Sequence, residues 1–294
     1  MEIPNKKLNS GFEMPAFGMG TWQMGGKDEK NPANDDQGDV AAIKAAIDLG
    51  ITHLDTAEVY AGGHAEALLG KAIKLYDRSK LFIASKVYAG HMHHDDLIAA
   101  CKGSLKRVGI DYFDMYYLHR YPGDELLAET LSAMEELAEK GLIRHIAISN
   151  FTLDHTRAAV KICKKPIAAT QVHYSLKFRE PEKQGLIKFC QENSIMIVAW
   201  RPLGFGPLKR GQVRPEEIEL VNLLAKKYGK TPAQIALNWL LSQENVVTLT
   251  KTSNIGHLME NLGAVEWQME KDDVENLRKN FPDQQYISDT VPLG

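Results

Sequence analysis

The sequence lacks the features that mark several large classes of protein. Its 294 residues include only three cysteines, Cys101, Cys163 and Cys190, which are widely spaced and form no CxxC pair. That usage excludes a zinc ribbon and fits reduced thiols in a cytoplasm. No apolar run reaches the roughly 18 residues that a membrane span needs, and the opening segment MEIPNKKLNSGFEMP is too polar for a signal peptide. We therefore expect a cytoplasmic protein.

An excess of charge of one sign is also missing. The chain has 35 Lys and Arg residues against 38 Asp and Glu residues, a formal net charge of -3. Without a basic field, neither nucleic acid nor a membrane surface is an expected partner. The 44% hydrophobic and 25% charged residues are typical of a globular protein that buries a substantial core. We expect a monomer that binds a small molecule.

Glycine motifs for nucleotide binding are absent as well. The segment GMG at residues 18–20 is not GxGxxG, and LLGK at residues 68–71 lacks the remainder of a P-loop. A Rossmann domain and a nucleotide hydrolase therefore have no support.

What the chain does contain is a regular alternation of short apolar runs and amphipathic helical patterns. This alternation is typical of βα units on a parallel sheet. Examples of the helical patterns are DQGDVAAIKAAIDLG, DELLAETLSAMEELAEKG and PEKQGLIKFCQEN, of which the first two stop at a glycine suited to a C-terminal cap. The eight strand candidates are residues 16–21, 52–56, 81–87, 112–119, 143–149, 167–172, 195–200 and 245–250.

Eight βα units close most simply as a (β/α)8 TIM barrel, an α/β fold in which residues 1–294 form a single domain. The first stretch reads as two short strands around Asn9-Ser10-Gly11, an N-terminal β-hairpin at the barrel bottom. Residues 201–220 add material between the seventh strand and the long helical patterns 215–228 and 232–241. Such an insertion is a candidate cover for a ligand.

Polar residues at strand ends are the candidates for chemistry, because a barrel of this kind builds its active site there. Asp55 ends the second strand with Tyr60 just beyond, Lys86 ends the third and His119 the fourth. A phenol donates a proton poorly at neutral pH unless a cation favours its anion, and Lys86 would supply that cation. Asp55 would hold Lys86 charged, and His119 would bind the substrate oxygen. Since none of the four is an evident nucleophile, a cofactor that donates hydride fits best.

These residues lie in segments that resemble the aldo-keto reductase family, and the resemblance covers nearly the whole chain. GITHLDTAEVY is similar to the family's second-strand signature, DYFDMYYLH to its fourth-strand signature and GLIRHIAISNF to its fifth-strand signature. The resemblance implies a catalytic tetrad of Asp55, Tyr60, Lys86 and His119. It also implies that hydride passes from NADPH to the carbonyl carbon of an aldehyde or ketone while Tyr60 delivers a proton to the oxygen.

The same resemblance implies a set of cofactor contacts along the later strands. Trp200 would stack on the nicotinamide, and the RPLG loop would approach the pyrophosphate. The implied contacts are Ser149, Asn150 and Gln171 for the nicotinamide carboxamide; Arg201, Leu203 and Gly204 in the RPLG loop; Lys251, Thr252 and His257 for the 2'-phosphate; and Glu260 and Asn261 for the adenine.

Three positions depart from the family pattern. His257 stands where the family usually has arginine and is a weaker partner for a phosphate, so that NADH stays an alternative to NADPH. Ala147 replaces a frequent glycine, a change that we expect to be tolerated. Arg120 follows His119 where several members have tryptophan. With Trp22 and Tyr88 it would shape the substrate mouth, where a cation could favour acidic or phosphorylated carbonyls.

Each of these residues also has a plainer interpretation when it is taken singly. Asp55 could cap a turn, Ser149-Asn150 could cap the helix that follows, Trp200 could be a core aromatic and Gln171 a polar strand end. The segment HMHHDD at residues 91–96 suggests a metal site, but its spacing argues for a loop and a helix start instead, and we expect no metal.

Two other functions compete with the reductase. Some members of the family mainly modulate a partner, although the intact tetrad favours an enzyme here. A different barrel enzyme could use Lys86 as a Schiff-base amine, but a lysine paired with Asp55 stays charged and is a poor nucleophile.

Overall fold

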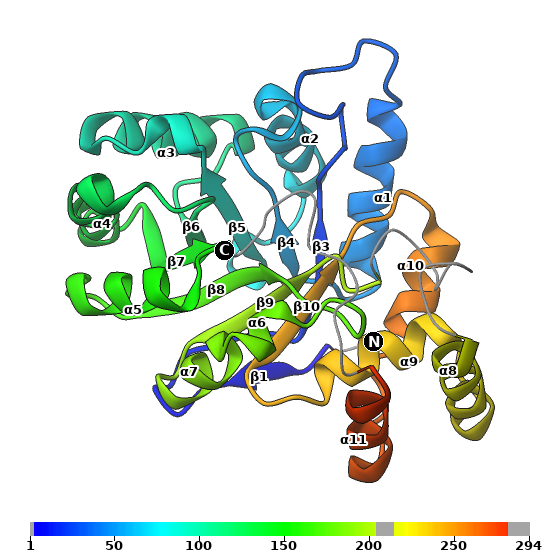
Figure 1. Cartoon of the computed structure of the whole chain (residues 1–294). Helices are drawn as coiled ribbons and strands as arrows, with labels where there is room; N and C mark the ends of the chain where they lie inside the picture. The colour runs from blue at the N-terminus through cyan, green and yellow to red at the C-terminus, as the bar shows by residue number, and fades with distance from the viewer. Residues whose placement is uncertain (1–2, 204–214, 282–294) are drawn as a thin grey trace.

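The chain folds around a closed barrel of eight parallel strands, with helices on the outside (Figure 1). The computed structural model describes residues 3–203 and 215–281. All eight predicted strands are confirmed, and each differs from its expected bounds by at most a residue or two. They are β3 (Phe17–Gly20), β4 (His53–Asp55), β5 (Phe82–Val87), β6 (Phe113–Leu118), β7 (Ile143–Ser149), β8 (Ile167–His173), β9 (Met196–Trp200) and β10 (Val246–Thr250).

The strands follow one another around the barrel in chain order, and β10 closes it by pairing with both β9 and β3. The helices of the βα units lie outside the barrel strands. Three short 3-10 helices among the described residues are η1 (Tyr60–Gly63), η2 (Arg78–Lys80) and η3 (Ala89–His91). The helices are α1 (Asp36–Asp48), α2 (His64–Ile73), α3 (His94–Val108), α4 (Asp124–Glu139), α5 (Leu153–Ile162), α6 (Glu180–Lys183), α7 (Leu186–Glu192), α8 (Pro215–Tyr228), α9 (Pro232–Leu241), α10 (Ile255–Leu262) and α11 (Lys271–Asn280).

Local sequence explains where the helices begin and end. Thr231 and Gln234 form a reciprocal capping box at the start of α9, and Pro232 takes the first helical position. One prediction was wrong: the pattern PEKQGLIKFCQEN is not a single helix but the pair α6 and α7. The break lies at Gly185, whose φ of +80° is left-handed and ends the first helical turn.

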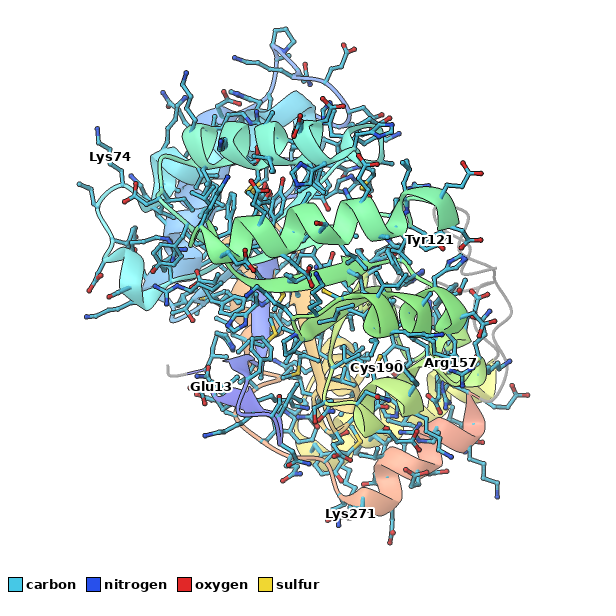
Figure 2. The ribbon with its side chains drawn as sticks, turned by 90° about the vertical axis from the view of Figure 1, so that its left-hand side faces the viewer. Glu13, Lys74, Tyr121, Arg157, Cys190 and Lys271 are labelled. Carbon is cyan, nitrogen blue, oxygen red and sulfur yellow. The ribbon has the colours of Figure 1, made fainter. Side chains whose placement is uncertain are left out.

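The hairpin at the barrel bottom is confirmed. Strands β1 (Asn5–Lys7) and β2 (Glu13–Pro15) pair antiparallel. Leu8 and Met14 are buried against side chains that fill the barrel interior, among them Met115 and Met196. Figure 2 shows the labelled Glu13 of the hairpin and Lys74 on one side of the molecule and Tyr121 on the opposite side. The hairpin therefore closes the end of the barrel at which the strands begin. The opposite end, where the strands finish, stays available for ligands.

No helix within the described part of the chain is long and apolar enough to cross a membrane. The proposed ligand cover lies largely in residues 204–214, outside the described residues, so that only Arg201 to Leu203 and α8 of that insertion have a described structure.

Met14→Ala is expected to lower the free energy of unfolding by about 2–5 kcal/mol, because the Met14 side chain is 1% exposed and its removal leaves a cavity under the barrel. Urea unfolding followed by circular dichroism measures the change. Met259→Ala is the matched control, since Met259 is 58% exposed on α10. Equal stability of the two variants would contradict the conclusion that the hairpin packs into the bottom of the barrel.

Candidate active site

Barrel closure brings the four candidate catalytic side chains to one mouth. Asp55 is the last residue of β4, Lys86 is the last but one of β5, and His119 follows directly after β6. Tyr60 opens the 3-10 turn η1 that follows β4. Neighbouring parallel strands end on the same side of the sheet, so residues 31 positions apart in the chain, such as Asp55 and Lys86, come into contact.

Lys86 is the centre of the group. Its side chain is completely buried, and its Nζ donates to Asp55 Oδ1 at 2.5 Å, to the Thr56 carbonyl at 2.8 Å and to the Tyr60 hydroxyl at 3.3 Å. An ammonium group has three N–H donors, and each one therefore has an acceptor here. The lysine is held in one orientation, between a carboxylate and a phenol.

The surroundings of Lys86 keep it protonated. Burial alone would lower its pKa, but the Asp55 carboxylate and the Tyr60 hydroxyl oppose burial, and the pKa is raised above its ordinary value. A lysine with a raised pKa is a poor nucleophile at neutral pH. This result supports the sequence-based argument against a Schiff base.

Two opposing effects act on the pKa of Tyr60. Burial raises it, the charge of Lys86 lowers it, and burial prevails, so that the pKa lies above its ordinary value. The sequence predicted the cation that acts on the phenol, but it does not show how far the phenol is removed from water. Tyr60 therefore carries its proton at neutral pH and has a cation within 3.3 Å.

His119 faces Tyr60 edge-on, with ring centroids 5.8 Å apart and an interplanar angle of 75°. Burial, the charge of Lys86 and the charge of Arg120 all lower the pKa of His119, to well below its ordinary value. The ring is therefore neutral at physiological pH, and what it can offer a ligand is a hydrogen bond rather than a positive charge.

Gln171, at 116 positions from Asp55 in the chain, extends the tetrad. Its Nε2 donates to Asp55 Oδ2 at 2.9 Å, so that each oxygen of the carboxylate has a partner. Sequence reasoning placed Gln171 on the nicotinamide carboxamide and missed this bond. The signal in the sequence was that both residues lie at or near the carboxyl ends of strands of the same barrel, which indicates a shared mouth but not a contact.

Asn150 connects two sides of the mouth. Its Nδ2 donates to the His119 carbonyl at 3.1 Å and to Ser149 Oγ at 3.0 Å, and its Oδ1 accepts from Trp200 Nε1 at 3.1 Å. Its backbone is left-handed, with a φ of +60°, a conformation that asparagine tolerates better than most residues. Neither Ser149 nor Asn150 caps α5, because Thr152 accepts the capping bond from the His155 amide.

Aromatic rings line the side of the mouth formed by β8 and β9. His173 lies between Phe178 and Trp200, with centroid distances of 3.9 and 4.6 Å and nearly parallel planes. The guanidinium of Arg201 lies 5.2 Å from the ring centroids of both Trp22 and Trp200. Trp200 is half-buried, not a fully enclosed core residue. Sequence reasoning missed His173, although its position two residues after Gln171 gave it the same face of β8.

The candidate adenosine segment follows β10 and forms the start of α10. Asn254 caps α10 by accepting from the His257 amide, and Lys251 is exposed just before it. A helix N-terminus together with a lysine attracts a phosphate. Ser253 donates to the buried Asp39 on α1 at 3.0 Å, which ties the segment to the barrel.

The other residues assigned to the cofactor that the structure describes make local hydrogen bonds or pack within the protein. Thr252 exchanges bonds with the backbone of Asn254, while Asn261 is buried and Glu260 half-buried on α10. Leu203 packs against the core. Gly204 lies outside the described residues.

Of the residues predicted to shape the substrate mouth, Tyr88 and Arg120 are exposed and Trp22 is half-buried. The Tyr88 amide donates to Glu58 Oε1, which also lies 3.1 Å from His91 Nδ1. The other histidines of HMHHDD likewise pair with carboxylates: His93 with Glu129, and His94 with Asp95 and Glu136. Within residues 3–203 and 215–281, no group of three or more potential ligands is arranged to hold a metal ion.

These residues fit a planar aromatic cofactor with phosphate groups. The half-buried Trp200 offers a ring at the mouth beside the tetrad, and the capped N-terminus of α10 with Lys251 offers a place for an anion. A protonated phenol beside a buried ammonium group and a neutral histidine, at the mouth of a (β/α)8 barrel, is an arrangement that can donate a proton to a ligand oxygen.

Comparison with known proteins identifies the family. Residues 16–280 match the model of the aldo/keto reductase family. The chain is 34% identical over 278 residues to a methylglyoxal reductase of Escherichia coli, with 94% of each chain covered. It is 31% identical over 273 residues to a glyoxal reductase of Bacillus subtilis, with 92% of this chain and 90% of the relative covered.

Similar solved structures support the same family assignment. A thermostable aldo-keto reductase, Tm1743, in complex with epalrestat has a TM-score of 0.88 and 41% identity, covering 94% of this chain and 99% of its own. An aldo/keto reductase of Klebsiella pneumoniae in complex with NADP and acetate has a TM-score of 0.82 and 33% identity, covering 97% of this chain and 98% of its own. The chain belongs to the aldo-keto reductase family.

His119 is expected to remain neutral across the physiological range, because burial and the charges of Lys86 and Arg120 all disfavour the imidazolium. NMR of protein labelled at the histidine ring nitrogens would show no titration of His119 between about pH 6 and 8. His119→Asn assigns the signal. A midpoint near the ordinary histidine value would contradict the expectation.

Proposed function

We propose that this protein reduces the carbonyl group of small aldehydes or ketones to an alcohol, with NADPH as the preferred cofactor. The observation that carries the proposal is the placement of Lys86 Nζ between Asp55 at 2.5 Å and the Tyr60 hydroxyl at 3.3 Å. Bound at Trp200, the reduced nicotinamide supplies the hydride that the reduction requires.

The residues of the tetrad then supply the proton and stabilise the negative charge that develops on the carbonyl oxygen. Tyr60 donates its hydroxyl proton to that oxygen, and the phenolate that remains is stabilised by the ammonium group of Lys86. Asp55 keeps Lys86 charged and in place. The neutral His119 donates a hydrogen bond to the same oxygen as negative charge develops on it, which lowers the energy of the transition state.

The residues around Trp200 are proposed to bind the cofactor. The Trp200 ring would stack on the nicotinamide, and Ser149, Asn150 and Gln171 would bind the carboxamide. In support, Gln171 donates to Asp55, Asn150 accepts from Trp200, and the Ser149 hydroxyl connects the two by accepting from Asn150 and donating to the Gln171 carbonyl. The remaining assignments are Arg201, Leu203 and Gly204 for the pyrophosphate; Lys251, Thr252 and His257 for the 2'-phosphate; and Glu260 and Asn261 for the adenine.

Trp22, Tyr88 and Arg120 are proposed to line the substrate side. The named activities of the two relatives, on methylglyoxal and on glyoxal, make small dicarbonyl compounds the first substrates to test. A single domain, a cytoplasmic location and a monomeric state remain predictions from the sequence.

Tyr60→Phe is expected to lower kcat by about a hundredfold or more, because it removes the proton donor. NADPH oxidation is followed at 340 nm with methylglyoxal, glyoxal and aromatic aldehydes as substrates. Binding of NADPH, measured by quenching of tryptophan fluorescence, should persist in the variant because the phenol ring is kept. A variant as active as the wild type would overturn the assignment of Tyr60. A wild-type protein that binds NADPH but turns over none of these carbonyls would favour a regulatory role.

His257→Arg is expected to tighten NADPH binding by about tenfold and to leave NADH binding unchanged. An arginine is permanently charged and binds phosphate oxygens with two donors, and NADH has no 2'-phosphate. Dissociation constants measured for both cofactors test this. His257→Gln is the control that keeps a polar side chain without a charge. Equal effects of the arginine on both cofactors would show that His257 does not meet the 2'-phosphate.

A further inference from the structure

The segment that holds Tyr60 has an unusual backbone. The three residues after it, Ala61, Gly62 and Gly63, have φ angles of +52°, +62° and +87°. The left-handed region is unfavourable for a residue with a side chain such as Ala61, whereas Gly62 and Gly63 adopt it readily, so Ala61 keeps this conformation only where contacts hold the turn. The position of the Tyr60 hydroxyl therefore depends on what braces this turn.

One brace is the guanidinium of Arg107, which reaches over from α3. It lies against the Cα of Gly63, where an added Cβ would come within 2.7 Å of Arg107 Nε. The close approach and the φ of +87° both favour glycine at that position, and the contact places a planar group against the end of the turn. Arg107 also donates to Ser104 Oγ at 3.0 Å, within its own helix.

Glu66 fixes Arg107 in that place. Its side chain is completely buried in the first turn of α2, directly after the left-handed turn. One carboxylate oxygen accepts from Arg107 Nε at 2.6 Å, and the other accepts from Ser85 Oγ at 2.6 Å. Ser85 precedes Lys86 on β5, and successive side chains of a strand point to opposite faces. Lys86 thus points into the barrel while Ser85 points out to Glu66.

We propose that Glu66 is a positioning residue for catalysis. Through Arg107 it braces the turn that holds Tyr60, through Ser85 it grips the strand that holds Lys86, and so it sets the distance between the two groups. The proposal rests on the function proposed above. It adds a residue outside the mouth, which touches neither substrate nor cofactor and acts through Tyr60 and Lys86.

The comparison that tests this uses Glu66→Gln and Arg107→Met, with Arg107→Lys as the conservative variant. The matched control is Arg78→Met, which removes a similarly buried ion pair, Arg78 with Asp114 at 2.7 Å, near the start of β5 instead of its end. Thermal unfolding, kcat, KM and the pH profile of kcat are measured for all five proteins, including the wild type.

Glu66→Gln and Arg107→Met are expected to lower kcat by about tenfold with little change in KM, because a small displacement of reacting groups slows the chemical step. In the pH profile of kcat, the fall in activity at alkaline pH should move to higher pH in both variants. The charge of Lys86 lowers the pKa of Tyr60, so a looser contact between Lys86 and Tyr60 leaves that pKa higher. Asp55 and the neutral His119 stay in place. Arg107→Lys should keep most of the activity, since it keeps a cation for Glu66.

The control distinguishes positioning from simple stabilisation. Arg78→Met should lose a similar amount of thermal stability and keep the kcat and pH profile of the wild type. If Glu66→Gln and Arg107→Met lose only stability, as the control does, the proposal is wrong. If the wild-type protein itself shows no turnover that depends on Tyr60, the proposed function fails first, and that result is separate from any effect of Glu66.

Discussion

The buried ion pair between Lys86 and Asp55 is the interaction on which the rest of the site depends. Removing two charges from water costs several kcal/mol for each ion, and their attraction offsets that cost only when the geometry is good and the remaining donors are satisfied. Here all three ammonium donors are used, one of them by the Tyr60 hydroxyl at 3.3 Å. A buried pair of this kind is weak evidence for stability, and is better explained by its place beside a proton donor.

The neighbouring polar groups at the mouth form a connected arrangement of hydrogen bonds. Gln171 completes the hydrogen bonding of Asp55, and Asn150 joins the carbonyl of His119 to the indole of Trp200. Strands β4, β6, β7, β8 and β9 are thus linked through side chains at their carboxyl ends. Preorganised dipoles of this kind need little rearrangement when charge develops on a substrate, which is how such a site lowers a barrier.

Most of the fold was predictable because its signals are local. A strand buried on both faces reads as an apolar run, and the alternation of such runs with amphipathic patterns predicted the eight barrel strands, while the turn residues Asn9-Ser10-Gly11 predicted the hairpin. The helix around Gly185 was mispredicted because the helical periodicity continues across a glycine whose left-handed backbone ends one helix and starts another. The resemblance assigned Gln171 to a ligand, and only the structure revealed its bond to Asp55, 116 residues away.

The sequence by itself determined the architecture, the family and which side chains end the barrel strands, because these follow from residue type, periodicity and short motifs. Only the tertiary structure decided how the side chains interact. It showed that burial outweighs the charge of Lys86 in raising the pKa of Tyr60, that the ring of His119 is neutral, and that Glu66 reaches both Arg107 and Ser85. The physical reason is that desolvation and hydrogen-bond geometry depend on the distances between residues far apart in the chain, and those distances exist only once the barrel has closed.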